Sequence, residues 1–363
     1  MSNFTLAIAC HGERNFLLET HCELPARGIT AICGPSGSGK TTLLDCIAGL
    51  RQPQAHSTII FRNTTWHAQA TFVPPWQRGI GYVFSDARLF PHLSVRDNLL
   101  YAKTRQSALT VHSFDTVCGE FGVTPLLDMT PDTLSAGQRQ RVAMARALVG
   151  GPGLLLLDEP FAHLDSAATR HCQRILKQLA VAQDLPMLYV SHNVEEVAQL
   201  ADYLVFMRDG RIVDQGPLLE LSGKLNTQLS RDEDAAAIVE AIVGQHDAAF
   251  ALTELQLEGQ PLQVKLLAAA PGTAYRVRIP ARDVSISRTR AEDTSILNIL
   301  PVEVADIAAV DNARVMLQLR IGQQVILARI TRKSAATLNL AIGDKVFAQI
   351  KSAALLGASA APL

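Results

Sequence analysis

The stretch Gly34-Pro35-Ser36-Gly37-Ser38-Gly39-Lys40-Thr41 decides the fold of this chain. It lies between an apolar run at 28–33, which predicts a buried strand, and residues 42–50, which predict a helix. Glycines let the backbone N–H groups of such a loop point inward at phosphate oxygens, where a Cβ would obstruct the approach. The helix that follows adds the positive end of its dipole. The stretch therefore predicts a loop that binds phosphate groups.

Two side chains at the end of this loop complete the predicted site. Lys40 places a cation on the β- and γ-phosphates of a nucleotide, and the Thr41 hydroxyl ligates Mg²⁺. A chance match is the alternative, and the flanking strand and helix make it rare. We assign phosphate binding to the loop and the first helical residues, namely Gly34, Pro35, Ser36, Gly37, Ser38, Gly39, Lys40, Thr41 and Thr42.

A second apolar run, Leu154-Leu155-Leu156-Leu157, ends in the acidic pair Asp158-Glu159. Such a run predicts a buried strand, and acids at its end can serve a metal ion and a water molecule. We expect Asp158 to hold Mg²⁺ through water and Glu159 to orient and deprotonate the attacking water. A general base of this kind contributes about 10²–10⁴ in rate. The simpler interpretation, an acidic pair that caps the next helix, is weakened by Lys40 upstream.

A third motif, Leu134-Ser135-Ala136-Gly137-Gln138, precedes a predicted helix at 139–149. Small residues ahead of a helix leave free N–H groups and a Ser hydroxyl that can receive an anion. By itself this is an ordinary helix start. Its place shortly before the acidic pair makes it specific.

In this order the three motifs resemble those of ABC ATPases, the nucleotide-binding subunits of ABC transporters. The resemblance implies a head-to-tail homodimer that sandwiches two ATP, with Ser135, Gly137 and Gln138 on the γ-phosphate held by the opposite subunit. Ala136 stands where the family usually has Gly. Ser191-His192-Asn193 matches the family's switch segment, so His192 is expected to touch the γ-phosphate. The simpler interpretation of His192 is a capping residue at the end of a strand.

Three further positions follow from the same resemblance. The segment at 161–165 matches the loop that crosses between the two ATP sites, although His163 is unusual there. Ser85 stands where the family normally has a Gln that reaches Mg²⁺, and we assign Ser85 to the metal because a hydroxyl can ligate it or hold a water. Phe16 is the candidate for stacking on adenine, and a core Phe in a strand is the alternative.

Bulk properties limit the partners and the compartment. A length of 363 residues predicts two or three domains, and a formal net charge of −1 argues against a nucleic-acid protein. The six cysteines show no CxxC pair and are expected to be reduced and buried in a cytosolic protein. We find no signal peptide and no apolar run long enough to span a bilayer, so a membrane role would come through a partner.

The predicted fold class is α/β: a P-loop ABC ATPase domain with a helical subdomain, followed by a small all-β, OB-like barrel. Further strands are predicted at 81–84, 154–158, 186–191 and 203–207, a mostly helical part at 86–133, and barrel strands at 275–280, 302–304, 315–321 and 325–330. We place the ATPase domain at 1–230, a connecting region at 231–285 that can supply strands to the carboxyl-terminal unit, and the barrel at 286–356. The Ala- and Leu-rich stretch at 218–244 is expected to close the first domain with helix.

Segments in both halves of the chain resemble those of the molybdate importers. The segment at 86–93, which faces the membrane partner in that family, and the segments at 282–286, 294–298 and 349–352 carry the likeness. A tetrahedral dianion needs hydroxyl and N–H donors and a cation. We assign an oxyanion site to Thr294, Ser295, Asn298, Lys351 and Ser352. Leu297 stands near where related barrels present an Arg, and ordinary turn composition is the alternative.

The resemblance implies an ATP-hydrolysing motor that drives molybdate import at the cytoplasmic face of the inner membrane as a peripheral protein. Its cofactors would be ATP and Mg²⁺, with molybdate as a regulatory ligand of the barrel. Its partners would be two transmembrane permease subunits and, indirectly, a periplasmic or extracellular molybdate-binding protein, with no nucleic acid. Two alternatives stay open: an importer ATPase for sulfate, tungstate, Fe³⁺ or a sugar, and a cytosolic ATPase switch that senses oxyanions.

Overall fold

The computed structural model describes residues 3–12, 16–103, 113–225, 227, 230, 234–351 and 353–358. The chain divides into two compact units, Met1–Gln215 and Gly216–Leu363. This division falls earlier in the chain than the boundary we expect at 230, and the domain limits given above stay a prediction. Within the described residues, no helix is long and apolar enough to cross a membrane. The six cysteines are buried, as predicted.

The first unit is built on a six-stranded sheet with the order β11-β10-β3-β9-β8-β7. Every neighbouring pair from β7 to β10 is parallel. Strands β3, β8 and β9 are buried along their whole length, as continuous apolar runs require in a sheet covered on both faces. The strands are β3 (Ile29–Cys33), β7 (Ile80–Val83), β8 (Leu154–Asp158), β9 (Met187–Val190), β10 (Tyr203–Arg208) and β11 (Arg211–Pro217). All the strands predicted for this part of the chain are therefore confirmed.

A second sheet of the first unit has the order β2-β1-β4-β5-β6. Its neighbouring strands pair antiparallel throughout. Helix α1 (Lys40–Ala48) buries Leu43, Leu44 and Ile47 in the same apolar cluster as β1 and β8, so one core joins α1 to both sheets. The strands are β1 (Asn3–His11), β2 (Leu17–Pro25), β4 (Thr58–Phe61), β5 (Thr64–Ala68) and β6 (Thr71–Phe72), and the short helix η1 (Pro75–Gln77) follows them.

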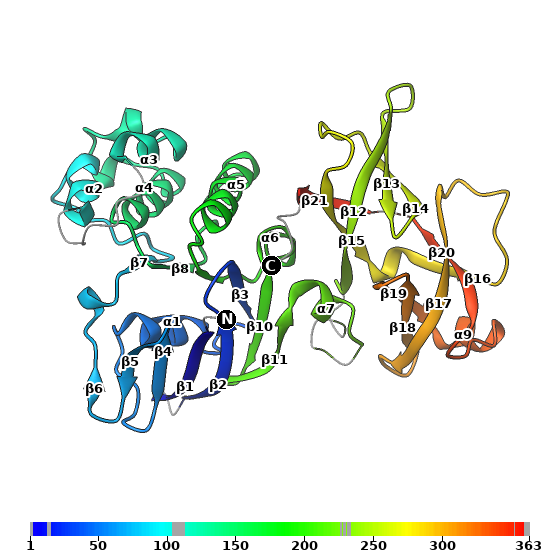
Figure 1. Ribbon diagram of the computed structural model, residues 1–363, viewed down its shortest axis with the longest axis horizontal. Coiled ribbons are helices and arrows are strands. Elements are labelled where there is room, and N and C mark those ends of the chain that lie inside the picture. The colour runs from blue at the N-terminus through cyan, green and yellow to red at the C-terminus, as the bar shows by residue number, and fades with distance from the viewer. Residues whose placement is uncertain are drawn as a thin grey trace. The chain divides into compact units, whose positions relative to one another are not determined.

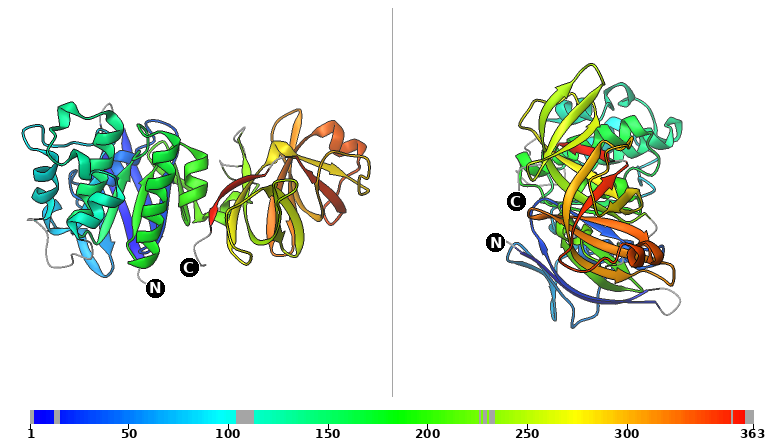
Figure 2. Two further views of the ribbon diagram at one scale, coloured as in Figure 1. Left: turned by 90° about the horizontal axis from the view of Figure 1, so that it is seen from above. Right: turned by 90° about the vertical axis from the view of Figure 1, so that its right-hand side faces the viewer.

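Three helices of the first unit pack together, and two more follow strands of the six-stranded sheet. In Figures 1 and 2, α2 (Val95–Lys103), α3 (Phe114–Glu120) and α4 (Ala136–Val149) lie together, and α4 contacts both other helices. The short helices η2 (Thr124–Leu126) and η3 (Pro131–Thr133) lie between α3 and α4 along the chain. This confirms the predicted helical part. Helices α5 (Ser166–Ala182) and α6 (Val194–Leu200) follow β8 and β9.

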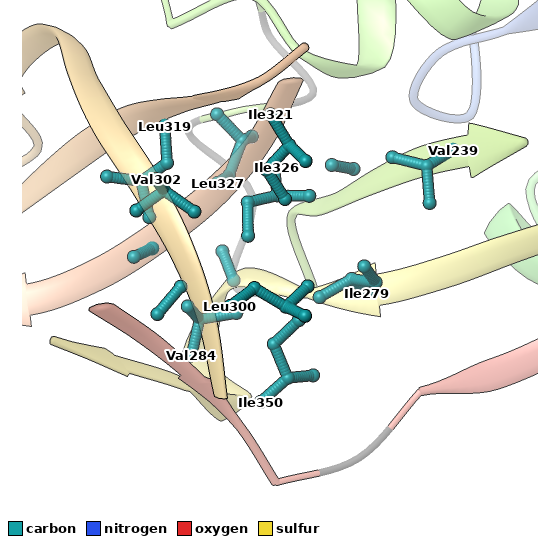
Figure 3. Close-up of a cluster of buried hydrophobic side chains, with 14 of the residues drawn as sticks. Val239, Ile279, Val284, Leu300, Val302, Leu319, Ile321, Ile326, Leu327 and Ile350 are labelled. Carbon is teal, nitrogen blue, oxygen red and sulfur yellow. The ribbon is translucent and has the colours of Figure 1, made fainter. Parts of the chain in front are cut away.

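The second unit consists of two five-stranded sheets, with the orders β14-β13-β12-β15-β21 and β16-β20-β17-β18-β19. Side chains from both sheets meet in one apolar core, where Val239 and Ile279 of the first sheet lie near Leu300 and Ile326 of the second (Figure 3). The strands are β12 (Ala236–Asp247), β13 (Leu252–Leu257), β14 (Gln260–Lys265), β15 (Ala274–Pro280), β16 (Val284–Ser287), β17 (Asn298–Ala309), β18 (Arg314–Ile321), β19 (Gln324–Thr331), β20 (Lys345–Ile350) and β21 (Ala354–Ala358). The short helices are α7 (Leu218–Ser222), η4 (Ala281–Asp283) and α9 (Arg332–Thr337). The predicted fold class, an α/β part followed by an all-β part, is confirmed.

The helix expected at 218–244 is wrong from Ala236 onward. Among the described residues of this stretch, α7 and Ser230 are helical, whereas β12 begins at Ala236 and belongs to the second unit. The residues of β12 that enter the apolar core alternate at Ala237, Val239, Ala241 and Val243, which is the period of a strand with one face in a core. The alanine content of this stretch favours helix, but the alternation of its apolar side chains with a period of two favours a strand.

Candidate functional site

The glycine loop joins β3 to α1 and places its backbone where larger residues do not fit. Gly34 has a φ of 145°, and a Cβ there would lie 2.1 Å from the Met207 carbonyl oxygen of the neighbouring strand β10. Gly39 has a φ of 97°, and a Cβ there would lie 2.7 Å from the Phe16 ring. The loop therefore packs tightly against its own sheet, with backbone N–H groups available at the start of α1.

Lys40 is held at the centre of this loop. Its ammonium donates to the carbonyl oxygens of Gly34 and Pro35 at 2.9 and 2.8 Å, and its side chain is 8% exposed. Burial lowers the pKa of Lys40, and the charge of Glu159 is the largest influence that opposes the change. The two loop carbonyls therefore hold the Lys40 ammonium in place beside the position predicted for the phosphates.

Thr41 and Asp158 meet at the end of β8. The Thr41 hydroxyl donates to Oδ2 of Asp158 at 2.8 Å. Asp158 is 4% exposed, and burial raises the pKa of its carboxyl while the Thr41 hydrogen bond opposes the rise. A buried carboxylate beside a hydroxyl is stabilised by a bound cation, and both groups are oxygen ligands of the kind Mg²⁺ prefers. The donor set therefore fits Mg²⁺.

Glu159 and His192 face each other across adjacent strand ends. Strands β8 and β9 are parallel, with Asp158 opposite Val190, so the residues that follow them lie at one edge of the sheet. His192 Nδ1 lies 3.3 Å from Glu159 Oε1. Both side chains line a cavity of about 420 Å³. A carboxylate and an imidazole in contact at an open cavity can hold a water and move a proton.

The third motif forms the start of α4. Ser135 caps this helix: its hydroxyl accepts from the Gln138 N–H at 3.1 Å, and Gln138 Oε1 accepts from the Ser135 N–H at 2.8 Å. This reciprocal pair is a capping box. A Cβ on Gly137 would lie 2.9 Å from the His163 carbonyl oxygen, so the motif packs against the loop after β8. Small residues are therefore required here by packing as well as by any role toward phosphate.

Phe16 and Ser85 lie next to the phosphate loop and the acidic pair, respectively. Phe16 packs on Gly39 and lines a pocket of about 310 Å³ together with Gly37. That position suits stacking on a base whose phosphates lie on the loop. Ser85 is exposed two residues beyond Val83, which pairs with Leu157, so it lies at the same sheet edge as Asp158. The roles of Phe16 on adenine and of Ser85 at the metal stay predictions.

Replacing Ser85 with Gln is expected to change the Mg²⁺ dependence of ATP hydrolysis. A Gln side chain is longer and carries an amide oxygen that can ligate the metal directly, whereas the Ser hydroxyl reaches less far. The ATPase rate is measured as a function of Mg²⁺ concentration in the wild type and in Ser85→Gln. Identical curves would make the substitution neutral, and the assignment of Ser85 to the metal would be withdrawn.

Sequence reasoning missed Asp45, which lies on α1. The Tyr82 hydroxyl donates to its Oδ1 at 3.1 Å, and the charge of Asp45 adds to the rise of the pKa of Asp158. An acidic residue inside a helix resembles any solvated surface position, so no local signal distinguishes it. Its effect comes from the packing of α1 against β7 and β8.

The residues assigned to an oxyanion site lie in the second unit. Thr294 and Ser295 are exposed before β17, and Asn298 pairs with Ile350, so Lys351 is its near neighbour. The Asn298 amide is nine-tenths buried and bonds the Gln263 backbone: Nδ2 donates to the carbonyl at 2.9 Å and Oδ1 accepts from the N–H. Leu297 is exposed. Asn298 and Lys351 are therefore neighbours, and Thr294 and Ser295 precede Asn298 by a few residues in the chain. Ser352 lies outside the described residues, and the bonds of Asn298 serve the fold.

The parallel sheet, the glycine loop and the acidic pair beside Lys40 define an ATP-binding cassette of the ABC transporter class. The ABC transporter family profile matches residues 17–162, and that of the TOBE domain matches residues 294–356. A dimeric ATP-binding cassette solved in a post-hydrolysis state with ADP and Pi matches with a TM-score of 0.52 at 23% identity, over 60% of this chain and 98% of that chain. This last likeness shows the fold alone.

Relatives named molybdenum import ATP-binding protein ModC match almost the whole chain. The one from Thiobacillus denitrificans is 46% identical over 94% of this chain and 95% of its own length. Those from Aromatoleum aromaticum and Methylococcus capsulatus are each 43% identical, over 95% and 94% of this chain and 92% and 96% of their own lengths. The chain belongs to the ModC family of ABC transporter ATP-binding proteins.

Proposed function

We propose that this chain is the ATP-hydrolysing motor of a molybdate importer and works as a head-to-tail homodimer with two ATP between its subunits. The observation that carries the proposal is the contact of Glu159 with His192 at the strand edge where Asp158 bonds Thr41. We infer the cargo from relatives named molybdenum import ATP-binding protein, which match both units of the chain.

The residues of the first unit divide the work of hydrolysis. Lys40 and the loop N–H groups bind the β- and γ-phosphates, with Phe16 against the adenine. Thr41 and Asp158 would hold Mg²⁺, with Ser85 beside them, and the ion would neutralise charge that develops on the phosphates. Glu159 takes a proton from the attacking water, and His192 contacts the γ-phosphate. Ser135, Gly137 and Gln138 complete the site of the opposite subunit.

The partners follow from the same proposal. The chain would bind two transmembrane permease subunits at the cytoplasmic face of the inner membrane, and these would receive molybdate from a periplasmic or extracellular binding protein. A cytosolic switch is the second interpretation. Membrane fractions from cells separate the two, because the motor copurifies with permease subunits and the switch does not.

The oxyanion role of the second unit is tested by calorimetric titration of the full-length protein with molybdate, tungstate and sulfate. Lys351 and the hydroxyls of Thr294 and Ser295 are the groups that would hold a dianion beside β17 and β20. We expect heat from molybdate and tungstate and none from sulfate, because the larger anions fit a wider cavity. No heat from any of the three would overturn regulation by bound molybdate and leave the motor proposal standing.

A further inference from the structure

The imidazole of His192 has little of its own to hold it in place. The side chain is 73% exposed, and the contact at 3.3 Å with Glu159 is the one that the described residues record for it. The rotamers open to an exposed side chain, and the point from which it projects, are set by the backbone that carries it. The orientation of His192 toward Glu159 therefore depends on what fixes residues 191 and 193 on either side of it.

Both neighbours of His192 bond the same carboxylate. The Ser191 hydroxyl donates to Oε2 of Glu196 at 2.9 Å, and the Asn193 amide donates to Oε1 at 3.4 Å. The Tyr189 hydroxyl, from the buried end of β9, donates to the same Oε2 at 2.8 Å. Glu196 on α6 is thus tied to the strand before His192 and to the residue on each side of it.

Hydrogen bonds of backbone N–H groups also hold the turn at 191–193. The Asn193 N–H donates to the Ser191 hydroxyl at 3.0 Å, and the Asn193 side chain caps α6 by accepting from the N–H groups of Glu195 and Glu196. Burial raises the pKa of the Tyr189 phenol, and the Glu196 charge adds to the rise, so the phenol remains a donor at neutral pH. Hydrogen bonds to a charged acceptor are stronger than those between neutral groups.

We propose that Glu196 is a positioning residue: it fixes the turn at 191–193 between β9 and α6 and so presents His192 to Glu159 and to the γ-phosphate. The proposal rests on the function given above, since it assigns a further residue to the same hydrolytic site. Glu196 touches neither nucleotide nor water in this role. It acts through His192.

The test is a double-mutant cycle of Glu196→Ala and His192→Ala, measured as kcat and KM of the full-length protein for ATP. Displacing a catalytic group by about 1 Å can cost on the order of 10²-fold. We therefore expect Glu196→Ala to lower kcat by about 10- to 100-fold and to leave KM within about 2-fold. Because Glu196 acts through His192, the double variant should be no slower than His192→Ala alone, which is the non-additivity of residues in one network.

Three comparisons keep the result interpretable. Glu195→Ala, an exposed acid next in sequence that lines the same cavity, should keep wild-type kcat. Glu196→Gln keeps an oxygen for Tyr189 and Ser191 and should recover most of the lost rate. If Glu196→Ala does not fold, Tyr189→Phe removes one of the three donors and enters the cycle in its place.

Two results would overturn the proposal. One is an additive cycle, in which Glu196→Ala slows the His192→Ala enzyme as much as it slows the wild type. The other is a Glu196→Ala enzyme with unchanged kcat. A wild-type chain without ATPase activity would overturn the proposed function instead, so the two failures are distinguishable.

Discussion

Glu159→Gln is expected to bind ATP as tightly as the wild type while its turnover falls by about 10²–10⁴-fold, the contribution of a general base. The amide has the shape of the carboxylate and keeps an oxygen that can accept from His192, so the geometry of the cavity should survive. It cannot accept the proton of the attacking water. The measurements are ATP binding by titration and release of inorganic phosphate under saturating ATP.

The matched control for this variant is Glu195→Gln. Glu195 lines the same cavity as Glu159 and is exposed, but it follows the start of α6 and has no place in the proposed reaction. It should retain wild-type turnover. A Glu159→Gln enzyme that keeps most of its activity would refute Glu159 as the base.

Lys40→Ala is expected to weaken the binding of ATP strongly. This variant loses a contact to the phosphates and leaves the general base in place. Its ammonium is buried among the Gly34 and Pro35 carbonyls and would meet the nucleotide phosphates there. Removing one partner of a buried charge pair costs roughly 2–5 kcal/mol. That range corresponds to binding about 30-fold to several thousand-fold weaker. Titration with ATP measures the change directly.

The control for Lys40 is the charge-conserving Lys40→Arg. A planar guanidinium is larger than an ammonium and does not fit a site built around a point charge, so this variant should also bind ATP weakly. The free energy of unfolding of both variants should be compared with that of the wild type. Undiminished ATP binding by Lys40→Ala would contradict the assignment of the loop as the phosphate site.

The first unit could be predicted because its signals are local in sequence. The loop at 34–41 and the strand that ends in Asp158 each carry their chemistry within a few residues, and buried parallel strands appear as unbroken apolar runs. The order of the motifs then places them at one sheet edge. Because β8 and β9 are neighbouring parallel strands, Glu159 and His192 follow them at the same sheet edge.

What the sequence did not reveal depends on packing between distant elements. Asp45 and Glu196 lie on helices where an acid is ordinary, and only the neighbouring strands bring Tyr82 and Tyr189 to them. The alanines of β12 favour helix, but every second residue from Ala237 to Val243 enters the core of the second unit. The roles of Asp45 and Glu196 and the strand conformation of β12 all depend on tertiary contacts.

Uptake of labelled molybdate tests the central claim most directly. Cells that lack this chain are compared, at low external molybdate, with the same cells that express the wild type or Glu159→Gln, and sulfate uptake is recorded in parallel. The account predicts that molybdate uptake is lost without the chain, returns with the wild type and does not return with Glu159→Gln, while sulfate uptake stays constant. Molybdate uptake that persists without the chain, or is restored by Glu159→Gln, would contradict it.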